Sequence, residues 1–102
     1  MNINKLMKQA QKMQEQMAQT QAELEKKTVE VSAGGGKVKV TANGAGDVIQ
    51  IKIDKEIVDP EDVEFLEETV LTAVKQAIEQ GKALAQSEMS RITGSLGIPG
   101  LQ

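Results

Sequence analysis

The sequence predicts an α+β protomer in which a three-stranded antiparallel meander lies between two long helices, in the order α-β-β-β-α. Three observations lead to this fold class. Apolar residues recur at helical spacing near the start of the chain, they alternate with polar residues in the middle, and helical spacing returns after an Asp-Pro pair.

The first helix is predicted over residues 3–24. No Gly or Pro interrupts this segment, and its apolar and small residues recur at alternating steps of three and four: Ile3, Leu6, Ala10, Met13, Met17, Thr20 and Leu24. This is a heptad seam of three repeats. Because the seam is narrow and includes Ala and Thr, we expect it to pack on one neighbouring helix rather than to cover a broad core.

Three strands follow, because the period changes to two at Thr28. The strands are predicted in "TVEVSA", "KVKVTA" and "VIQIKID", and each places its apolar residues on one face. The intervening segments "GGG" and "NGAGD" are predicted to be turns, with Gly44 or Gly46 at a positive φ, since Gly and Asn accept the backbone conformations of tight hairpins.

The second helix is predicted to start at "DPED", with Asp59 as the N-cap and Pro60 in the first helical position. It is expected to run to about Ile92. Gly81 lies inside it, either as a tolerated weakness or as a point where another backbone approaches closely. We therefore expect a single domain over residues 1–93 and a flexible tail over residues 94–102.

The composition predicts a thin core and hence an oligomer. Hydrophobic residues make up 39% of the chain and aromatic residues 1%, with Phe65 the single aromatic. Aromatic side chains supply much of the buried area in most cores, so this protomer gains by burying surface against a second copy. The apolar face of the meander is the expected homodimer interface, through Val38, Val40, Ile49 and Ile51.

The same inventory argues against catalysis. The sequence has no His, Cys or Tyr, and so lacks the commonest general base, a thiol nucleophile and a phenolic acid. We expect no enzyme, cofactor, metal or small-molecule substrate. No apolar run approaches the roughly 20 residues of a membrane span, and no apolar stretch follows the first lysines as in a signal peptide. A soluble, cytoplasmic protein is expected.

Charge is segregated along the chain, although the formal net charge is -3. Residues 1–27 carry five Lys and three Glu, whereas residues 56–102 carry three basic and nine acidic groups. On a helical wheel, Lys5, Lys8 and Lys12 form a stripe nearly opposite the heptad seam. Amide side chains that can hydrogen-bond to phosphates or bases lie beside this lysine stripe: Asn4, Gln9 and Gln11. From the residues alone, a solvated helix face or a membrane-surface helix would also explain the stripe.

Several segments together resemble the YbaB/EbfC family of nucleoid-associated proteins. They are "LMKQAQKMQEQM", "GGGKVKVTANGAGDVIQIKID", "LEETVLTAVKQAI" and "SRITGSLGIPGL". The resemblance implies a homodimer whose long helices project as arms, which binds double-stranded DNA with little sequence preference and associates with the nucleoid. It also implies that Lys5, Lys8 and Lys12 lie on these arms.

Physical considerations indicate how such a protein would bind. Phosphate neutralisation dominates DNA affinity, Arg91 is the only arginine available to read guanine, and no aromatic series can stack bases. We expect weak to moderate duplex binding, mainly to the backbone and strongly dependent on salt. The alternative is a protein-interaction module that serves DNA repair or replication factors without touching DNA.

Overall fold

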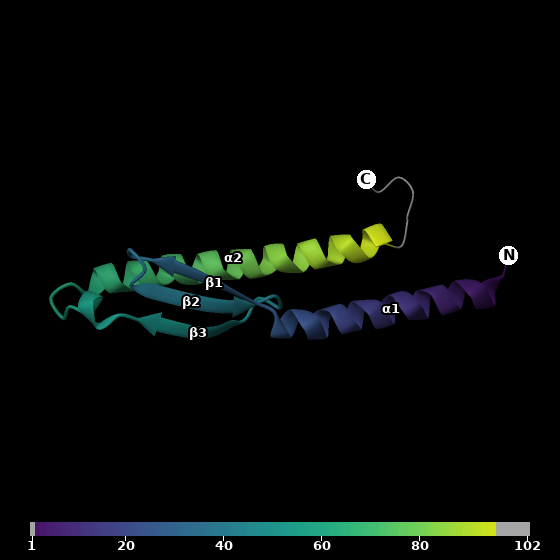
Figure 1. Cartoon of the computed structure of the whole chain (residues 1–102), viewed down its shortest axis with the longest axis horizontal. Helices are drawn as coiled ribbons and strands as arrows, with labels where there is room; N and C mark the ends of the chain where they lie inside the picture. The colour runs from purple at the N-terminus through teal and green to yellow at the C-terminus, as the bar shows by residue number, and fades with distance from the viewer. Residues whose placement is uncertain (1, 96–102) are drawn as a thin grey trace.

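The computed structural model describes residues 2–95 and confirms the predicted α-β-β-β-α order (Figure 1). One short 3-10 helix, η1, is added before the last helix. The elements are α1 (Ile3–Lys26), β1 (Thr28–Ala33), β2 (Val38–Asn43), β3 (Val48–Ile53), η1 (Lys55–Ile57) and α2 (Val63–Ser95).

The strands form one antiparallel sheet in the order β1-β2-β3, as a meander should. Gly34, Gly35 and Gly36 all have positive φ in the first turn, and Gly46 has φ 89° in the second, which confirms the predicted positive-φ glycine. A bulge between Thr41 and Ala42 shifts the register of β3. Ile49 is the extra residue of this bulge.

The core lies between α2 and the inner face of β1 and β2. Val38 and Val40 are 0% exposed, and they are the largest fully buried side chains among the described residues. Ala73 and Ala77 of α2 are also fully buried in this cluster. Because alanine side chains are short, the helix can approach the two strands closely, and the resulting core is as thin as the composition predicts.

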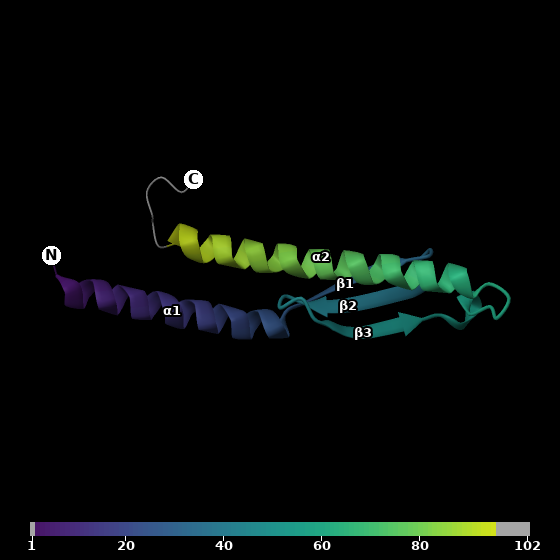
Figure 2. The same cartoon turned by 180° about the vertical axis from the view of Figure 1, so that it is seen from behind.

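The inner face of β3 is left uncovered. Figure 2 shows α2 lying over β1 and β2, with β3 standing beyond its edge. Val40 and Ile51 are directly paired across β2 and β3 and therefore share one face. Val40 is 0% exposed, whereas Ile51 is 44% exposed.

The start of α2 differs from the prediction. Asp59 Oδ1 accepts a hydrogen bond from Glu61 N at 2.9 Å, which closes a local turn before the helix. The cap of α2 is instead Asp62, whose Oδ1 accepts from Phe65 N at 3.3 Å. The predicted Asp59 cap was wrong because its side chain bonds two residues ahead in a turn that precedes the helix.

The far end of α2 reaches Ser95, so Gly94 is still helical. The predicted tail over residues 94–102 otherwise lies outside the described residues.

Gly81 marks a close approach of two backbones. A Cβ added there would lie 2.5 Å from the carbonyl oxygen of Asn43, at the end of β2. Of the two interpretations offered by the sequence, the close approach is therefore the correct one.

We expect Gly81→Ala to destabilise the protein by about 1–3 kcal/mol, because the added methyl group overlaps a backbone oxygen. The same change at an unconstrained helical position stabilises by roughly 1 kcal/mol, so the sign of the effect is diagnostic. Urea unfolding measures it. Ala83→Gly, at an exposed position of the same helix, is the control and should cost about 1 kcal/mol. A Gly81→Ala protein more stable than wild type would contradict the close approach.

Candidate nucleic-acid interface

The first two-thirds of α1 forms a free arm. Figure 1 shows α1 running away from the sheet past the end of α2. From Ile3 to Gln19 every residue is exposed except Gln16, which is half-buried. The arm begins with Asn2, whose side chain accepts a hydrogen bond from Lys5 N at 3.2 Å and caps the helix.

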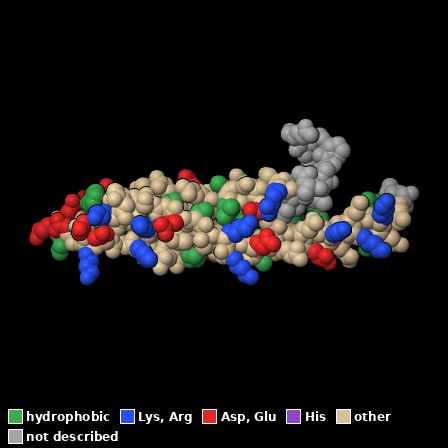
Figure 3. Space-filling model, in the orientation of Figure 1, with side chains coloured by type: hydrophobic (Ala, Val, Ile, Leu, Met, Phe, Trp, Pro, Cys, Tyr) green, Lys and Arg blue, Asp and Glu red, His purple; other side chains and the backbone are tan. Residues whose placement is uncertain are grey.

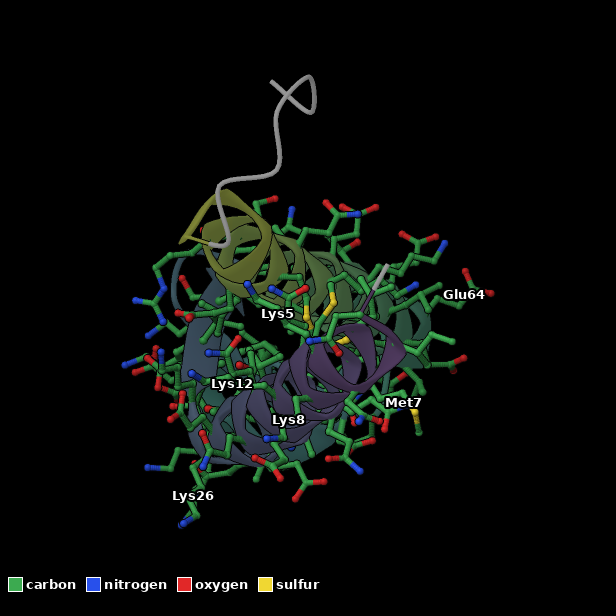
Figure 4. The ribbon with its side chains drawn as sticks, turned by 90° about the vertical axis from the view of Figure 1, so that its right-hand side faces the viewer. Lys5, Met7, Lys8, Lys12, Lys26 and Glu64 are labelled. Atoms are coloured by element: carbon green, nitrogen blue, oxygen red, sulfur yellow. The ribbon has the colours of Figure 1, made fainter. Side chains whose placement is uncertain are left out.

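All six residues predicted from the sequence to contact DNA are exposed on this arm: Asn4, Lys5, Lys8, Gln9, Gln11 and Lys12. Viewed along the molecule, Lys5, Lys8 and Lys12 spread over one side of α1, and Met7 points to the other (Figure 4). None of the three lysines forms an ion pair with a described residue. The arm thus presents three uncompensated positive charges to solvent.

The heptad seam is covered at one end only. Thr20 and Leu24 are buried at the base of the arm, whereas Ile3 is 65% exposed and Leu6 51% exposed at its tip. Within the protomer, the seam is therefore packed, as predicted, only at the end of α1 next to the sheet.

The turn between β2 and β3 holds the base of the arm. Gly44 N donates to Leu24 O at 2.8 Å and to Lys27 O at 3.0 Å, and Asn43 Nδ2 donates to Glu25 O at 3.3 Å. These bonds satisfy carbonyls that the end of a helix leaves without partners. The sequence predicted a hairpin turn here, but not its contact with α1, because no local pattern signals a bond to a residue far back in the chain.

An ion pair also joins the end of α1 to α2. Lys27 Nζ lies 2.7 Å from Glu88 Oε1, and Arg91 also pairs with Glu88. Glu88 is 13% exposed. The hydrogen bond from Lys27 lowers the pKa of Glu88, and the charge of Arg91 lowers it further. No local pattern predicts this cluster, because Lys27 lies far from Glu88 and Arg91 in the chain.

Acidic and basic side chains are unevenly distributed over the surface. Acidic residues crowd the end of the molecule where α2 begins, whereas Lys and Arg side chains lie over the sheet and along α1, with some acidic side chains among them (Figure 3). Glu64, from the acidic start of α2, lies on the side opposite Lys12 and Lys26 in Figure 4. A polyanion can therefore approach the basic side without meeting this acidic end.

The residues predicted for the dimer interface separate into two pairs. Val38 and Val40 are buried within their own protomer, so their side chains have no surface to offer a second copy. That part of the prediction needs correction, because α2 already covers them. Ile49 and Ile51 are 54% and 44% exposed and remain available.

The described residues contain neither a metal-binding cluster nor a membrane-spanning helix. Among residues 2–95, no three His, Cys, Asp or Glu side chains come together in a group that could hold a metal ion. Within the same residues, neither helix has the length and apolar character needed to cross a bilayer.

The fold and this surface define a small α+β protein that presents a basic helical arm. A sequence profile described as the YbaB/EbfC DNA-binding family matches residues 1–96, and the chain belongs to this family. A protein named "Nucleoid-associated protein" in Acetivibrio thermocellus is 54% identical over 101 residues, covering 98% of this chain and 89% of the relative. Another of that name in Ruminiclostridium cellulolyticum is 52% identical over 101 residues, covering 98% and 88%.

A solved structure shares the fold. The crystal structure of an uncharacterized protein from Helicobacter pylori matches with a TM-score of 0.77 at 21% identity, covering 95% of this chain and 99% of that chain. At this identity the match concerns the fold alone.

The Lys27–Glu88 pair should make stability dependent on acidic pH. Because the pKa of Glu88 is lowered in the folded protein, its contribution is fully present above the ordinary value of 4.5 and disappears as pH falls through the lower folded pKa. Glu88→Gln should therefore melt below wild type above pH 4.5, and the gap should close in stronger acid. Glu79→Gln, at an exposed position of α2, is the control. A gap that stays constant through the acid range would show that the ion pair does not stabilise the fold.

Proposed function

We propose that this protein is a homodimer that binds duplex DNA through phosphate contacts from its α1 arms, with low sequence preference, and that it associates with the nucleoid in the cytoplasm. The observation that carries the proposal is the set of three exposed, unpaired lysines on the free arm, Lys5, Lys8 and Lys12, in a chain of a DNA-binding family. We place the protein among binding proteins rather than enzymes because its sequence offers no His, Cys or Tyr.

The side chains available favour contact with the DNA backbone over base reading. Lysine ammonium groups are point charges that pair with phosphates. The single arginine, Arg91, lies on α2 and not on the α1 arm, and it is paired with Glu88. The arm therefore has no arginine for the bidentate contact that reads guanine. Asn4, Gln9 and Gln11 can add hydrogen bonds to phosphates or sugars. Low sequence preference follows, because phosphate contacts carry no sequence information.

Dimerisation is proposed through the uncovered inner face of β3. Val48, Ile49, Ile51 and Ile53 of this strand are all at least 36% exposed. β3 is also an edge strand, and an exposed apolar edge favours association. A second copy that covered these side chains would complete a layer that α2 covers only over β1 and β2, and it would double the number of arm lysines.

Replacing Ile49 and Ile51 together by Gln should convert the dimer to monomers. Burying one isoleucine side chain is worth roughly 1.5–3 kcal/mol, and each is already half-exposed in the protomer. The dissociation constant should therefore rise about 100-fold or more. Light scattering at micromolar concentration measures it. Met7→Gln, an exposed apolar position on the arm outside the seam, should leave the mass unchanged. A monomeric wild-type protein would refute the dimer.

The arm is tested by changing Lys5, Lys8 and Lys12 to Gln together. DNA affinity should fall severely, and the slope of log K against log salt should shrink by up to about 0.9 for each phosphate that the arm no longer neutralises. Melting temperature should hardly change, because Gln forms helices nearly as well as Lys. Gel shifts across a salt series with unrelated duplexes measure both the affinity and the slope.

The control removes the same charge elsewhere, with Lys55, Lys75 and Lys82 changed to Gln; all three are exposed and unpaired among the described residues. Equal binding by the arm variant and the wild-type protein would reject the arm as the DNA-binding surface. That result would favour the second candidate function, a protein-docking arm. The exposed seam supports this candidate, since Ile3, Leu6 and Met17 are between 40% and 65% exposed.

A further inference from the structure

Two lysines face one another on the outer face of the sheet. Lys39 of β2 is paired directly with Lys52 of β3, and Ser32 of β1 completes the row. Like charges placed directly opposite in an antiparallel pair are destabilising. Neither lysine forms an ion pair within the described part of the chain. The fold thus holds two uncompensated positive charges side by side.

The neighbouring charges do not neutralise this lysine pair. The nearby carboxylates form ion pairs with Lys37 instead. Its Nζ pairs with Glu56 and lies 3.7 Å from Asp54 Oδ2. The hydrogen bond to Glu56, followed by the charge of Asp54, raises the pKa of Lys37. Glu30 lies one row away on the sheet, opposite Thr41.

The surface beside the lysine pair is open to a ligand. A shallow hollow of about 250 Å³ is lined by Gly36, Lys37, Lys39, Lys52, Ile53 and Asp54. At Gly35 and Gly36, in the adjoining turn, no atom lies within 4 Å of where a Cβ would be. The turn therefore leaves room beside the lysine pair, and lysine side chains can bind phosphate oxygens there.

The lysine pair and the arm lysines lie on one side of the molecule. In Figure 1, β1 passes in front of α2, so the outer face of the sheet faces the viewer. This side becomes the left of Figure 4, where Lys12 and Lys26 project. Figure 3 shows Lys and Arg side chains on this side both over the sheet and along α1. The uncovered apolar face of β3 is the opposite face of the sheet, so a second copy bound there would leave the lysine pair free.

We infer that the outer face of the sheet is a second contact for the DNA backbone, with Lys39 and Lys52 binding phosphates of the same duplex that the arm binds. The duplex would run along the protomer from the lysine pair to the arm. This path is shorter than the longest extent of the protomer, 71 Å, so about 20 base pairs are enough to span it. The inference rests on the proposed function, because it takes duplex DNA as the ligand of the arm.

The test compares the wild-type protein with Lys39→Gln/Lys52→Gln on duplexes of about 10 and about 25 base pairs, of which only the longer can reach both surfaces. The wild-type protein should bind the longer duplex much more tightly, and the variant should lack most of this advantage. For each protomer that contacts the longer duplex, two fewer neutralised phosphates lower the salt slope by about 1.8. Between 50 and 200 mM salt, the affinity of wild type should therefore fall by at least roughly tenfold more than that of the variant.

Three further proteins make the result specific. Lys75→Gln/Lys82→Gln removes the same charge from exposed positions of α2 and should behave as wild type. Lys39→Arg/Lys52→Arg keeps both charges and should retain the advantage of the longer duplex. The arm variant at Lys5, Lys8 and Lys12 should bind both lengths weakly.

The melting temperature separates a change in DNA binding from damage to the fold. Lys39→Gln/Lys52→Gln should melt at or above the wild-type temperature, because the repulsion between the two lysines is removed. If this variant keeps the affinity and salt slope of wild type on the longer duplex, the sheet contact is refuted, whatever the arm variant does. If the arm variant binds normally while the sheet variant does not, the proposed arm contact fails and the sheet contact stands.

Discussion

The bonding of the β2–β3 turn to the end of α1 is the constraint on which the shape of this protein depends. There is no room for a side chain at position 44, since a Cβ added to Gly44 would lie 2.6 Å from Leu24 Cδ2. Its N–H reaches two carbonyls at the end of α1, and the neighbouring Asn43 lies against Gly81 of α2. One turn therefore fixes α1 relative to both the sheet and α2. The arm beyond it needs no packing of its own to keep its direction.

A consequence is that three surfaces can serve different purposes without competing. The inner face of β3 is apolar and uncovered, the outer face of the sheet carries Lys39 and Lys52, and the arm carries its own lysine stripe. Because strand side chains alternate between faces, an apolar contact on one face of β3 does not hinder an ionic contact on the other. The acidic start of α2 lies at the end of the molecule away from the arm.

Much of the fold could be predicted from the sequence because its patterns are local. The seam predicted α1 to within two residues of its end, and alternation predicted all three strands. The turn sequence predicted a positive φ at Gly44 or Gly46, and the structure shows it at Gly46. The lysine stripe of the candidate site was predicted in the same way, since the face of a lone helix follows from spacing alone. The cap of α2 was misplaced because Asp59 and Asp62 carry the same local signal, and only hydrogen bonding distinguishes them.

By itself, the sequence determined which residues are helical, which are extended and which side chains share a face. Tertiary structure alone decided which of those faces are covered. The alternating pattern predicts the same burial for Val40 and Ile51, yet Val40 is buried and Ile51 is 44% exposed. The reason is geometric: a helix about 10 Å across spans only about two strands at a spacing near 4.8 Å, so the third strand stays open. The pairing of Lys39 with Lys52 likewise required the register of β2 and β3, which no single segment encodes.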